Sequence, residues 1–122
     1  MKRAFRLRSR KVFAQVLRQG RTLGSRHVVV FWLRDGGDGG QRLEIGFAVQ
    51  RAVGSAVRRN RVRRRLRALA QVLAEELPAQ GRMVWLGKVS ALDAPWGELV
   101  DGTRRMLRRL RAERDPQDRG AG

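Results

Sequence analysis

Apolar side chains recur at helical spacing in three segments of the chain, and each of these segments predicts a helix. The first helix is expected at about Arg10–Gln19, with Ser9 as its N-cap and Gly20 just beyond its end. Its apolar face consists of Val12, Phe13, Val16 and Leu17. Such a helix packs one side on a core and leaves the other in water.

A longer helix is expected from the candidate N-cap Ser55 to Leu77, where Pro78 follows. Its apolar positions recur at steps of three or four residues, at Val62, Leu66, Leu69, Leu73 and Leu77. A last helix is expected from near Pro95, a residue that suits the first helical position, to about Arg111. The inner face of that last helix is expected to consist of Leu99, Met106, Leu107 and Leu110.

Three shorter segments are rich in β-branched and aromatic residues and predict strands, at His27–Arg34, Gln41–Gln50 and Arg82–Val89. The glycine-rich segment Asp35–Gly40 separates the first two, so they are expected to pair as a hairpin. Apolar residues fall on both faces of the first strand, which indicates that both faces of the sheet are at least partly covered. In the second strand, Gly46 would let another element pack closely.

The order helix, strands, helix, strand, helix indicates a small α+β or α/β sandwich, with helices packed on a sheet of three or four strands. The length of 122 residues fits one domain, expected at residues 1–111. Residues 112–122 lack apolar periodicity, so we expect a disordered tail there. The three tryptophans are expected to be core or packing residues, at Trp32, Trp85 and Trp96.

The charge of the chain is extreme, since 28 Lys+Arg against 11 Asp+Glu give a formal net charge of +17. Charge of this size concerns partners rather than fold, with nucleic acid as the first candidate and an anionic membrane surface as the second. The absence of cysteine excludes a disulfide framework and a thiolate metal site. The longest apolar run, Val28–Leu33, is far too short to span a membrane, so we expect a cytoplasmic protein.

The segment Arg51–Arg67 concentrates this charge, with eight arginines and no acidic residue. Opposite the apolar stripe lie Asn60, Arg63, Arg64 and Arg67. Like-charged side chains three or four residues apart cost about 0.2–0.5 kcal/mol a pair, and the helix dipole disfavours cations near its N-terminus. Bound phosphates would relieve both penalties, and planar guanidinium groups suit bidentate phosphate contacts. The sequence therefore predicts a phosphate-binding face rather than a merely solvated one.

Candidate catalytic groups are few. His27 is the only histidine, and we interpret it as a polar residue at a strand edge rather than a base. Asp35 and Asp38 lie in a glycine-rich segment that suits a turn better than a metal site. No HExxH motif, phosphate-binding loop or nucleophile–base pair is present. We therefore expect the chain itself to perform no chemistry, and we assign it no bound metal or cofactor.

The basic segment resembles a family signature. The pattern Gly54-Ser55-Ala56-Val57-x-Arg59-Asn60-Arg61-x-Arg63-Arg64-x-x-Arg67 is similar to the RNR signature of the protein subunit of bacterial ribonuclease P. The order of the expected elements also agrees with that family over roughly residues 3–111. The resemblance implies a compact two-layer fold of three helices on a four-stranded sheet, in the order α-β-β-β-α-β-α. It also implies a left-handed parallel βαβ crossover, against the usual right-handed rule.

The resemblance further implies a function. In this family the RNA subunit is the ribozyme that removes the 5′ leader of precursor tRNA with Mg²⁺, while the protein binds ribonuclease P RNA and the leader and requires no protein partner. The RNA-binding face carried over to this chain consists of Arg51, Arg59, Asn60, Arg61, Arg63, Arg64 and Arg67. The implied leader cleft lies between the first helix and the sheet, and is lined by Phe13, Leu17 and Phe31.

The chain departs from the family pattern at several positions. Leu17 stands where an aromatic residue is common and Phe31 where a tyrosine is common, while Arg65 adds a charge where an apolar residue is usual. The residues alone leave Phe13 and Phe31 open to a plain core role. Two other functions also stay open: a ribosomal or ribosome-assembly RNA-binding protein, and a membrane-surface protein. The second is disfavoured because the basic helix needs its apolar stripe for the core.

Overall fold

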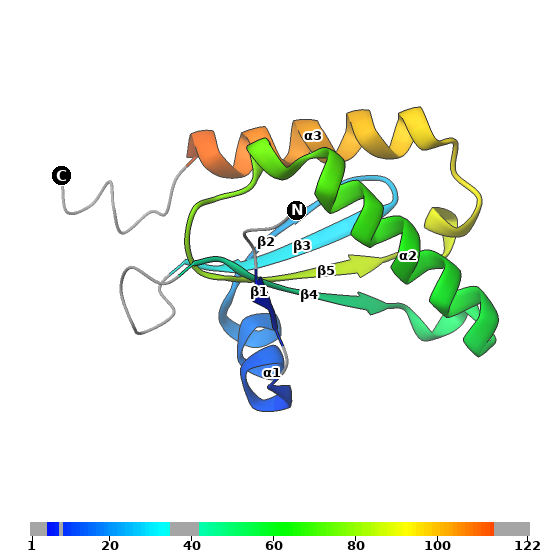
Figure 1. Ribbon diagram of the computed structural model, residues 1–122, viewed down its shortest axis with the longest axis horizontal. Coiled ribbons are helices and arrows are strands. Elements are labelled where there is room, and N and C mark those ends of the chain that lie inside the picture. Colours follow the sequence, from blue (N-terminus) through cyan, green and yellow to red (C-terminus); the bar gives the residue numbers. More distant parts are fainter. Residues whose placement is uncertain (1–4, 8, 35–41, 114–122) are drawn as a thin grey trace, which may run out of the picture.

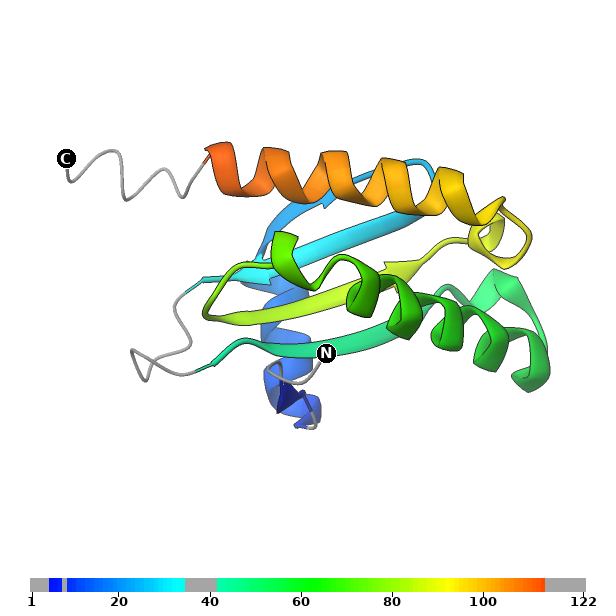
Figure 2. The ribbon, with the colours of Figure 1, turned by 45° about the horizontal axis from the view of Figure 1, so that its top comes forward.

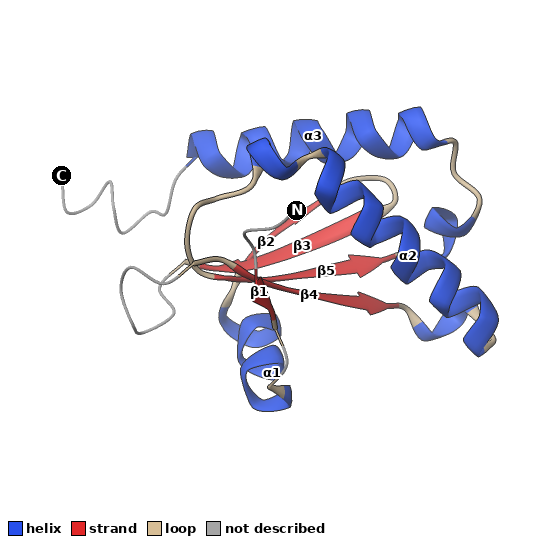
Figure 3. Ribbon diagram, viewed as in Figure 1, coloured by secondary structure: helices blue, strands red, loops and turns tan. Residues whose placement is uncertain are grey.

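The computed structural model describes residues 5–7, 9–34 and 42–113, which form one mixed sheet with helices on both faces (Figure 1; coloured by secondary structure in Figure 3). The strands are β1 (Phe5–Arg6), β2 (Arg21–Gly24), β3 (Val28–Leu33), β4 (Glu44–Val49) and β5 (Arg82–Gly87). The α-helices are α1 (Arg10–Gln19), α2 (Ala56–Val72) and α3 (Trp96–Glu113). Short 3-10 turns form η1 (Arg51–Val53), η2 (Ala74–Glu76) and η3 (Val89–Leu92). The predicted turn Asp35–Gly40 and nearly all of the predicted tail lie outside the described residues.

The strand order is β1-β4-β5-β3-β2, so the predicted hairpin is wrong. β5 lies between the two strands that were expected to pair, antiparallel to β3 and parallel to β4. Met83, Val84 and Trp85 of β5 are all buried, as is typical of a central strand covered on both faces. The expectation rested on the tendency of consecutive strands to pair, and burial of the apolar run of β5 outweighs that tendency here.

Two edge strands complete the sheet. β2 pairs with β3 and is the fourth strand that the family resemblance implies. Its sequence RTLG holds a single apolar side chain and a glycine, which is why the residue pattern alone does not predict it. At the other edge, the two-residue β1 pairs with β4 in parallel. Leu7, which follows β1, is buried, so the N-terminal segment is held against the sheet.

The unit β4–α2–β5 is a parallel βαβ unit, and its crossover connection is left-handed. In Figure 1 both strands run from left to right with β5 above β4, and Figures 1 and 2 together place α2 on the viewer's side of the sheet. A right-handed unit seen from that side would place β5 below β4. The handedness implied by the family resemblance is therefore present.

The core has two parts, one on each face of the sheet. α2 and α3 cover one face, where Leu66, Trp85 and Leu107 belong to the larger cluster of buried residues. α1 covers the other face, where Val16 and Val84 belong to a smaller cluster. The predicted α+β sandwich of three helices on a sheet is present (Figure 2), with the sheet between two helical layers rather than beneath one.

Glycines in the strands let both helical layers approach closely. A Cβ atom added at Gly46 would lie 2.7 Å from Cε2 of Phe13 in α1, which confirms the predicted close packing at this position. A Cβ atom at Gly87 would lie 2.5 Å from Cγ1 of Val62 in α2. Any larger residue at either position would push a helix away from the sheet.

The helix starts agree with the sequence predictions, and one helix end does not. The Ser9 hydroxyl accepts a hydrogen bond from the backbone N–H of Val12 at 3.2 Å, and Ser55 caps α2 in the same way. α2 ends at Val72 rather than at Leu77, because the chain tightens into η2. Leu73 stays buried there, so the apolar stripe continues after the α-helix has ended.

Candidate nucleic-acid interface

A constrained backbone turn positions the start of α2 at the end of β4. Val53 of η1 is buried, and Gly54 has a φ of 116°, a value that residues with a Cβ atom rarely adopt. Ser55 then caps the helix, since its hydroxyl accepts a hydrogen bond from the backbone N–H of Arg58 at 3.3 Å. The first turn of α2 is therefore fixed relative to the sheet, with Arg51 exposed beside it in η1.

α2 is two-sided, as the sequence predicts. Its buried side consists of Val62, Leu66, Leu69 and Ala70. Asn60, Arg64 and Arg67 are exposed on the other side, while Arg63 is half-buried and its Nη1 donates to the Asn60 side-chain oxygen at 3.2 Å. The guanidinium of Arg67 lies 6.0 Å from the centre of the Phe47 ring. The structure thus places the predicted RNR residues together along one helix.

The exposed arginines of α2 lack acidic partners. Within the described residues, Arg58, Arg61 and Arg64 form no ion pair, and the first turn of the helix contains no acidic residue. Nε of Arg59 is buried without a hydrogen-bond partner in this part of the chain. Cations at a helix N-terminus are repelled by the positive end of the helix dipole and by one another. This end of α2 is therefore a concentrated positive surface with unused hydrogen-bond donors.

Arg65 behaves differently from its neighbours, a difference that no pattern in the sequence predicts. Its Nη1 donates to the carbonyl oxygens of Ala91 and Leu92 at 2.8 and 2.9 Å, and its Nη2 donates to that of Ala94 at 2.6 Å. Burial lowers the pKa of Arg65, and so does repulsion by the Arg61 charge. Arg65 is thus a link between α2 and the segment that precedes α3.

Trp96 packs at this link rather than in the core. It was predicted to be a core or packing residue and is 39% exposed, whereas Trp32 and Trp85 are buried. The Arg65 guanidinium lies 6.0 Å from the centre of the Trp96 ring, a cation–π distance. The tryptophan therefore covers the arginine link rather than filling the core.

The predicted cleft residues all lie on the α1 side of the sheet. Phe13 and Phe31 are half-buried and belong to the same cluster, whereas Leu17 is 40% exposed at the end of α1. Phe31 pairs with Val84 of β5, and Val29, two residues away on the same face, is also only partly buried. An apolar surface thus borders α1, on the opposite face of the sheet from α2.

His27 is buried, so its predicted place at a polar strand edge is wrong. Its Nε2 lies 2.5 Å from Oε2 of Glu98, and its Nδ1 lies 2.6 Å from the Ser90 hydroxyl. The hydrogen bond with His27 holds the pKa of Glu98 below its ordinary value. The ionised carboxylate can only accept, so Nε2 of His27 donates to it. These contacts tie the start of β3 to η3 and α3.

The described residues contain neither a candidate metal site nor a candidate membrane span. No group of three or more histidine or acidic side chains there is placed to hold a metal ion. No helix in the same residues is both long enough and apolar enough to cross a membrane.

Comparisons with known proteins agree with these features. The sequence model of the Ribonuclease P family matches residues 1–111. The chain is 39% identical over 110 residues to the Ribonuclease P protein component of a Nocardioides species, which covers 90% of this chain and 94% of that protein. It is also 39% identical over 99 residues to that of Symbiobacterium thermophilum, covering 81% of this chain and 84% of that protein.

The fold is similar to that of solved RNase P proteins. The protein from Thermotoga maritima superposes with a TM-score of 0.72 at 23% identity, covering 86% of this chain and 96% of that chain. The protein from Staphylococcus aureus gives a TM-score of 0.70 at 19% identity, covering 85% of this chain and 93% of that chain. The family match and the sequence identity show that this chain belongs to the ribonuclease P protein family.

Proposed function

We propose that this chain is the protein subunit of ribonuclease P, which binds ribonuclease P RNA and precursor tRNA and assists removal of the 5′ leader. Membership of the family makes it a component of an RNA-processing endoribonuclease that works with ribonuclease P RNA. The observation that carries the finer proposal is the arginine surface at the start of α2. That surface has an excess of donors and no acidic partner among the described residues.

The start of α2 supplies contacts to the phosphate backbone of the ribonuclease P RNA. Arg59, Arg61 and Arg64 present guanidinium groups, which form paired hydrogen bonds with phosphate oxygens. Arg51 extends the surface from η1, next to the first turn. Phosphates there would offset the repulsion among like charges, which water and salt only screen.

The α1 side of the sheet supplies the site for the leader. Single-stranded RNA is held by apolar and aromatic side chains beside a positive surface. Such a surface is formed by Phe13, Leu17 and Phe31. These side chains remain partly exposed because no other part of the described chain fully covers them. Because α2 lies on the other face of the sheet, the protein would contact RNA on two sides.

We assign the cleavage chemistry to the RNA subunit with its Mg²⁺. The side chains on the α2 surface are mainly arginines, which have no lone pair to offer a cation. Mg²⁺ requires oxygen ligands, which RNA phosphates supply in quantity. The role of this chain is then to hold and neutralise the two RNAs.

Reconstitution tests the proposal. The full chain is mixed with a bacterial ribonuclease P RNA and precursor tRNA at a Mg²⁺ concentration too low for the RNA alone. We expect the chain to restore removal of the 5′ leader. In the control, the same RNA is mixed with an equally basic unrelated protein and should remain inactive. Activity no greater than that with the unrelated protein would contradict the proposal.

Leu17→Ala tests the leader site with little risk to the fold, because the side chain is 40% exposed. We expect affinity for precursor tRNA to fall by about twofold to fivefold. RNA would newly bury only the exposed part of the Leu17 side chain, which corresponds to about one CH₂ group or about 0.8 kcal/mol. Affinity for mature tRNA should not change. Val72→Ala is the matched control, because Val72 is 54% exposed on α2. Equal losses for both tRNAs would place the leader elsewhere.

A further inference from the structure

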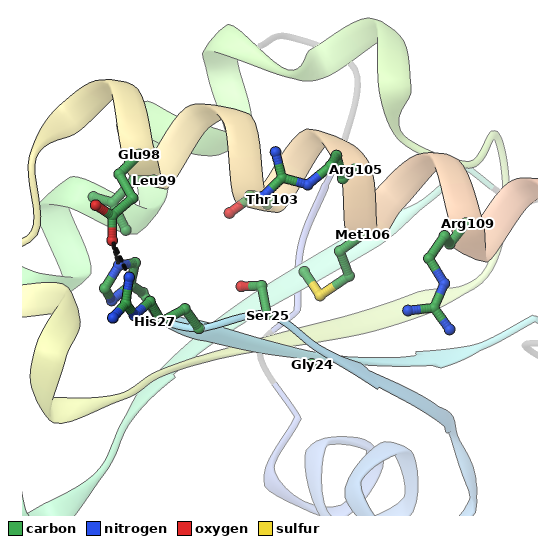
Figure 4. Close-up of a pocket in the computed structure, with 11 residues that line it drawn as sticks. Gly24, Ser25, His27, Glu98, Leu99, Thr103, Arg105, Met106 and Arg109 are labelled. Carbon is green, nitrogen blue, oxygen red and sulfur yellow. Dashed lines mark hydrogen bonds and ion pairs between the residues drawn. The ribbon is translucent and has the colours of Figure 1, made fainter.

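A cavity of about 280 Å³ lies between α3 and the turn that joins β2 to β3 (Figure 4). It is separate from the α2 surface and from the α1 side of the sheet. Gly24 and Ser25 line it on the strand side, and Leu99 and Met106 of α3 give it apolar surface. A concave apolar site with a few polar groups is the usual form of a small-ligand site.

One polar group in this cavity lacks a partner. Thr103 is only 1% exposed, and its Oγ1 is buried without a hydrogen bond in the described part of the chain. Figure 4 shows the side chain on the cavity side of α3. A buried hydroxyl without a partner is unfavourable, so a ligand that bonds to Thr103 would remove a penalty already present in the fold.

The charge around the cavity is positive. Arg105 and Arg109 lie one helical turn apart on α3, and both line the cavity. The one acidic residue in the lining, Glu98, is held by His27 and by Arg26, whose Nη1 lies 3.5 Å from its carboxylate. Its carboxylate is thus already engaged by hydrogen-bond donors of the protein. The net charge of the lining therefore favours an anion, and the apolar surface favours a flat or hydrophobic group beside that anion.

We propose that this cavity binds one nucleotide of an RNA strand. The phosphate contacts Arg105 at the rim, the base lies against Met106, and the Thr103 hydroxyl bonds to a polar group of the base edge. The choice of RNA as the source rests on the proposed function. The site gives the protein a third RNA contact, on the α3 side.

Titration of the isolated full chain with nucleoside monophosphates, followed by amide NMR signals, tests the site without the ribozyme. We expect shifts at Ser25, His27 and Thr103. Thr103→Val removes the hydroxyl and keeps the shape, so binding should weaken about twofold to tenfold while the fold stays intact. Arg105→Gln should weaken binding about tenfold or more, because a charge-assisted contact is lost. Arg108→Gln is the charge-matched control, since Arg108 does not line the cavity.

Several results would overturn the proposal. Unchanged signals around the cavity would do so, as would equal binding by inorganic phosphate, which would leave the base without a site. Equal weakening by Arg105→Gln and Arg108→Gln would show a response to net charge only. These outcomes are independent of reconstitution, because a chain that activates ribonuclease P RNA could still lack the nucleotide site.

Filling the cavity distinguishes a strand nucleotide from a free one. A Cβ atom at Gly102 would lie 4.0 Å from the Ser25 Cβ, so Gly102→Leu places its side chain at the cavity without a clash at Cβ. Gly97→Leu is the control, because a Cβ atom there has no neighbour within 4 Å. We expect Gly102→Leu alone to weaken binding of ribonuclease P RNA, by about threefold to tenfold. Loss of mononucleotide binding with unchanged RNA binding would overturn the assignment to RNA.

Discussion

α2 and α3 are both rich in arginine, and they use it in different ways. On α2, Arg61 and Arg64 face water without an ion pair among the described residues. On α3, three arginines converge on one carboxylate, that of Glu76 in η2. The nitrogen–oxygen distances are 3.8 Å for Arg104, 3.1 Å for Arg108 and 3.8 Å for Arg111.

The difference lies in where the acidic residues stand. Glu76 follows the C-terminal end of α2, so the arginines of α3 hold that end of α2 to their own helix. The first turn of α2 contains no acidic residue, and within the described residues Arg58, Arg61 and Arg64 form no ion pair. Arginine content alone therefore does not separate a cation that stabilises the fold from one that is available to RNA; the position of its counter-ion does.

The largest expected effect comes from removing Arg61 and Arg64 together. If these side chains bind phosphates, the double alanine variant should lose about a hundredfold in RNA affinity, at roughly a factor of ten for each charged contact. The slope of log affinity against log salt should decrease by about 1.4–1.8, since each phosphate contact contributes about 0.7–0.9. Fluorescence titration at several salt concentrations measures both quantities.

The matched control is Arg104→Ala with Arg108→Ala, which removes the same charge from α3. Its RNA affinity should decrease far less, because Glu76 already occupies these arginines. If both double variants lose equal affinity and equal slope, net charge alone governs binding and the distinction between the two helices fails.

Arg65 sharpens the comparison, because it lies on α2 and yet is satisfied internally like the arginines of α3. Arg65→Ala leaves the carbonyl oxygens of Ala91, Leu92 and Ala94 without their donor. We expect the free energy of unfolding to decrease by about 1–3 kcal/mol. Urea denaturation measures it.

Arg64→Ala serves as the control for Arg65, since an exposed side chain without partners should change stability by less than about 0.5 kcal/mol. Equal stability of the two variants would mean that the carbonyl contacts add nothing. A loss of RNA affinity in Arg65→Ala larger than in Arg64→Ala would mean that Arg65 binds RNA directly.

Local structure follows closely from the sequence. The bounds of α1 and the serine caps at Ser9 and Ser55 are as predicted, because capping and apolar spacing depend on residues a few positions apart. The buried face of α3 was likewise predicted, and Leu99 and Leu110 are buried. The end of α2 was not predicted correctly, because the spacing of its leucines continues through a 3-10 turn.

Long-range structure was less accessible. The pairing of β3 with β5 joins segments separated by a helix, and no local pattern favours it over a hairpin. The partners of Arg65 lie 26 to 29 residues away in sequence, so its role could not be distinguished from that of Arg64. The RNA contacts of Arg59 to Arg67 and of the α1 side remain predictions, because they depend on a partner molecule.

The smallest expected effect is that of Glu76→Gln, and it reverses the comparison by freeing the arginines of α3. The hydrogen bond from Arg108 lowers the pKa of Glu76 below its ordinary 4.5, and the charges of Arg108, Arg104 and Arg111 add to this effect. A lowered pKa means that the ionised form stabilises the fold above pH 4.5 and that this contribution is lost as the pH falls through the lower folded value. The difference in melting temperature between wild type and Glu76→Gln should therefore be full at neutral pH and should shrink in acid.

RNA binding by the same variant should change in the opposite direction from stability. The freed arginines of α3 should raise RNA affinity a few-fold and make its salt dependence steeper. Glu75→Gln is the control, because it makes the same change of charge at the neighbouring exposed position, whose side chain does not hold these arginines. An equal gain in Glu75→Gln would reduce the effect to net charge. A gain confined to Glu76→Gln would show that an internal counter-ion is what keeps the arginines of α3 from acting like those of α2.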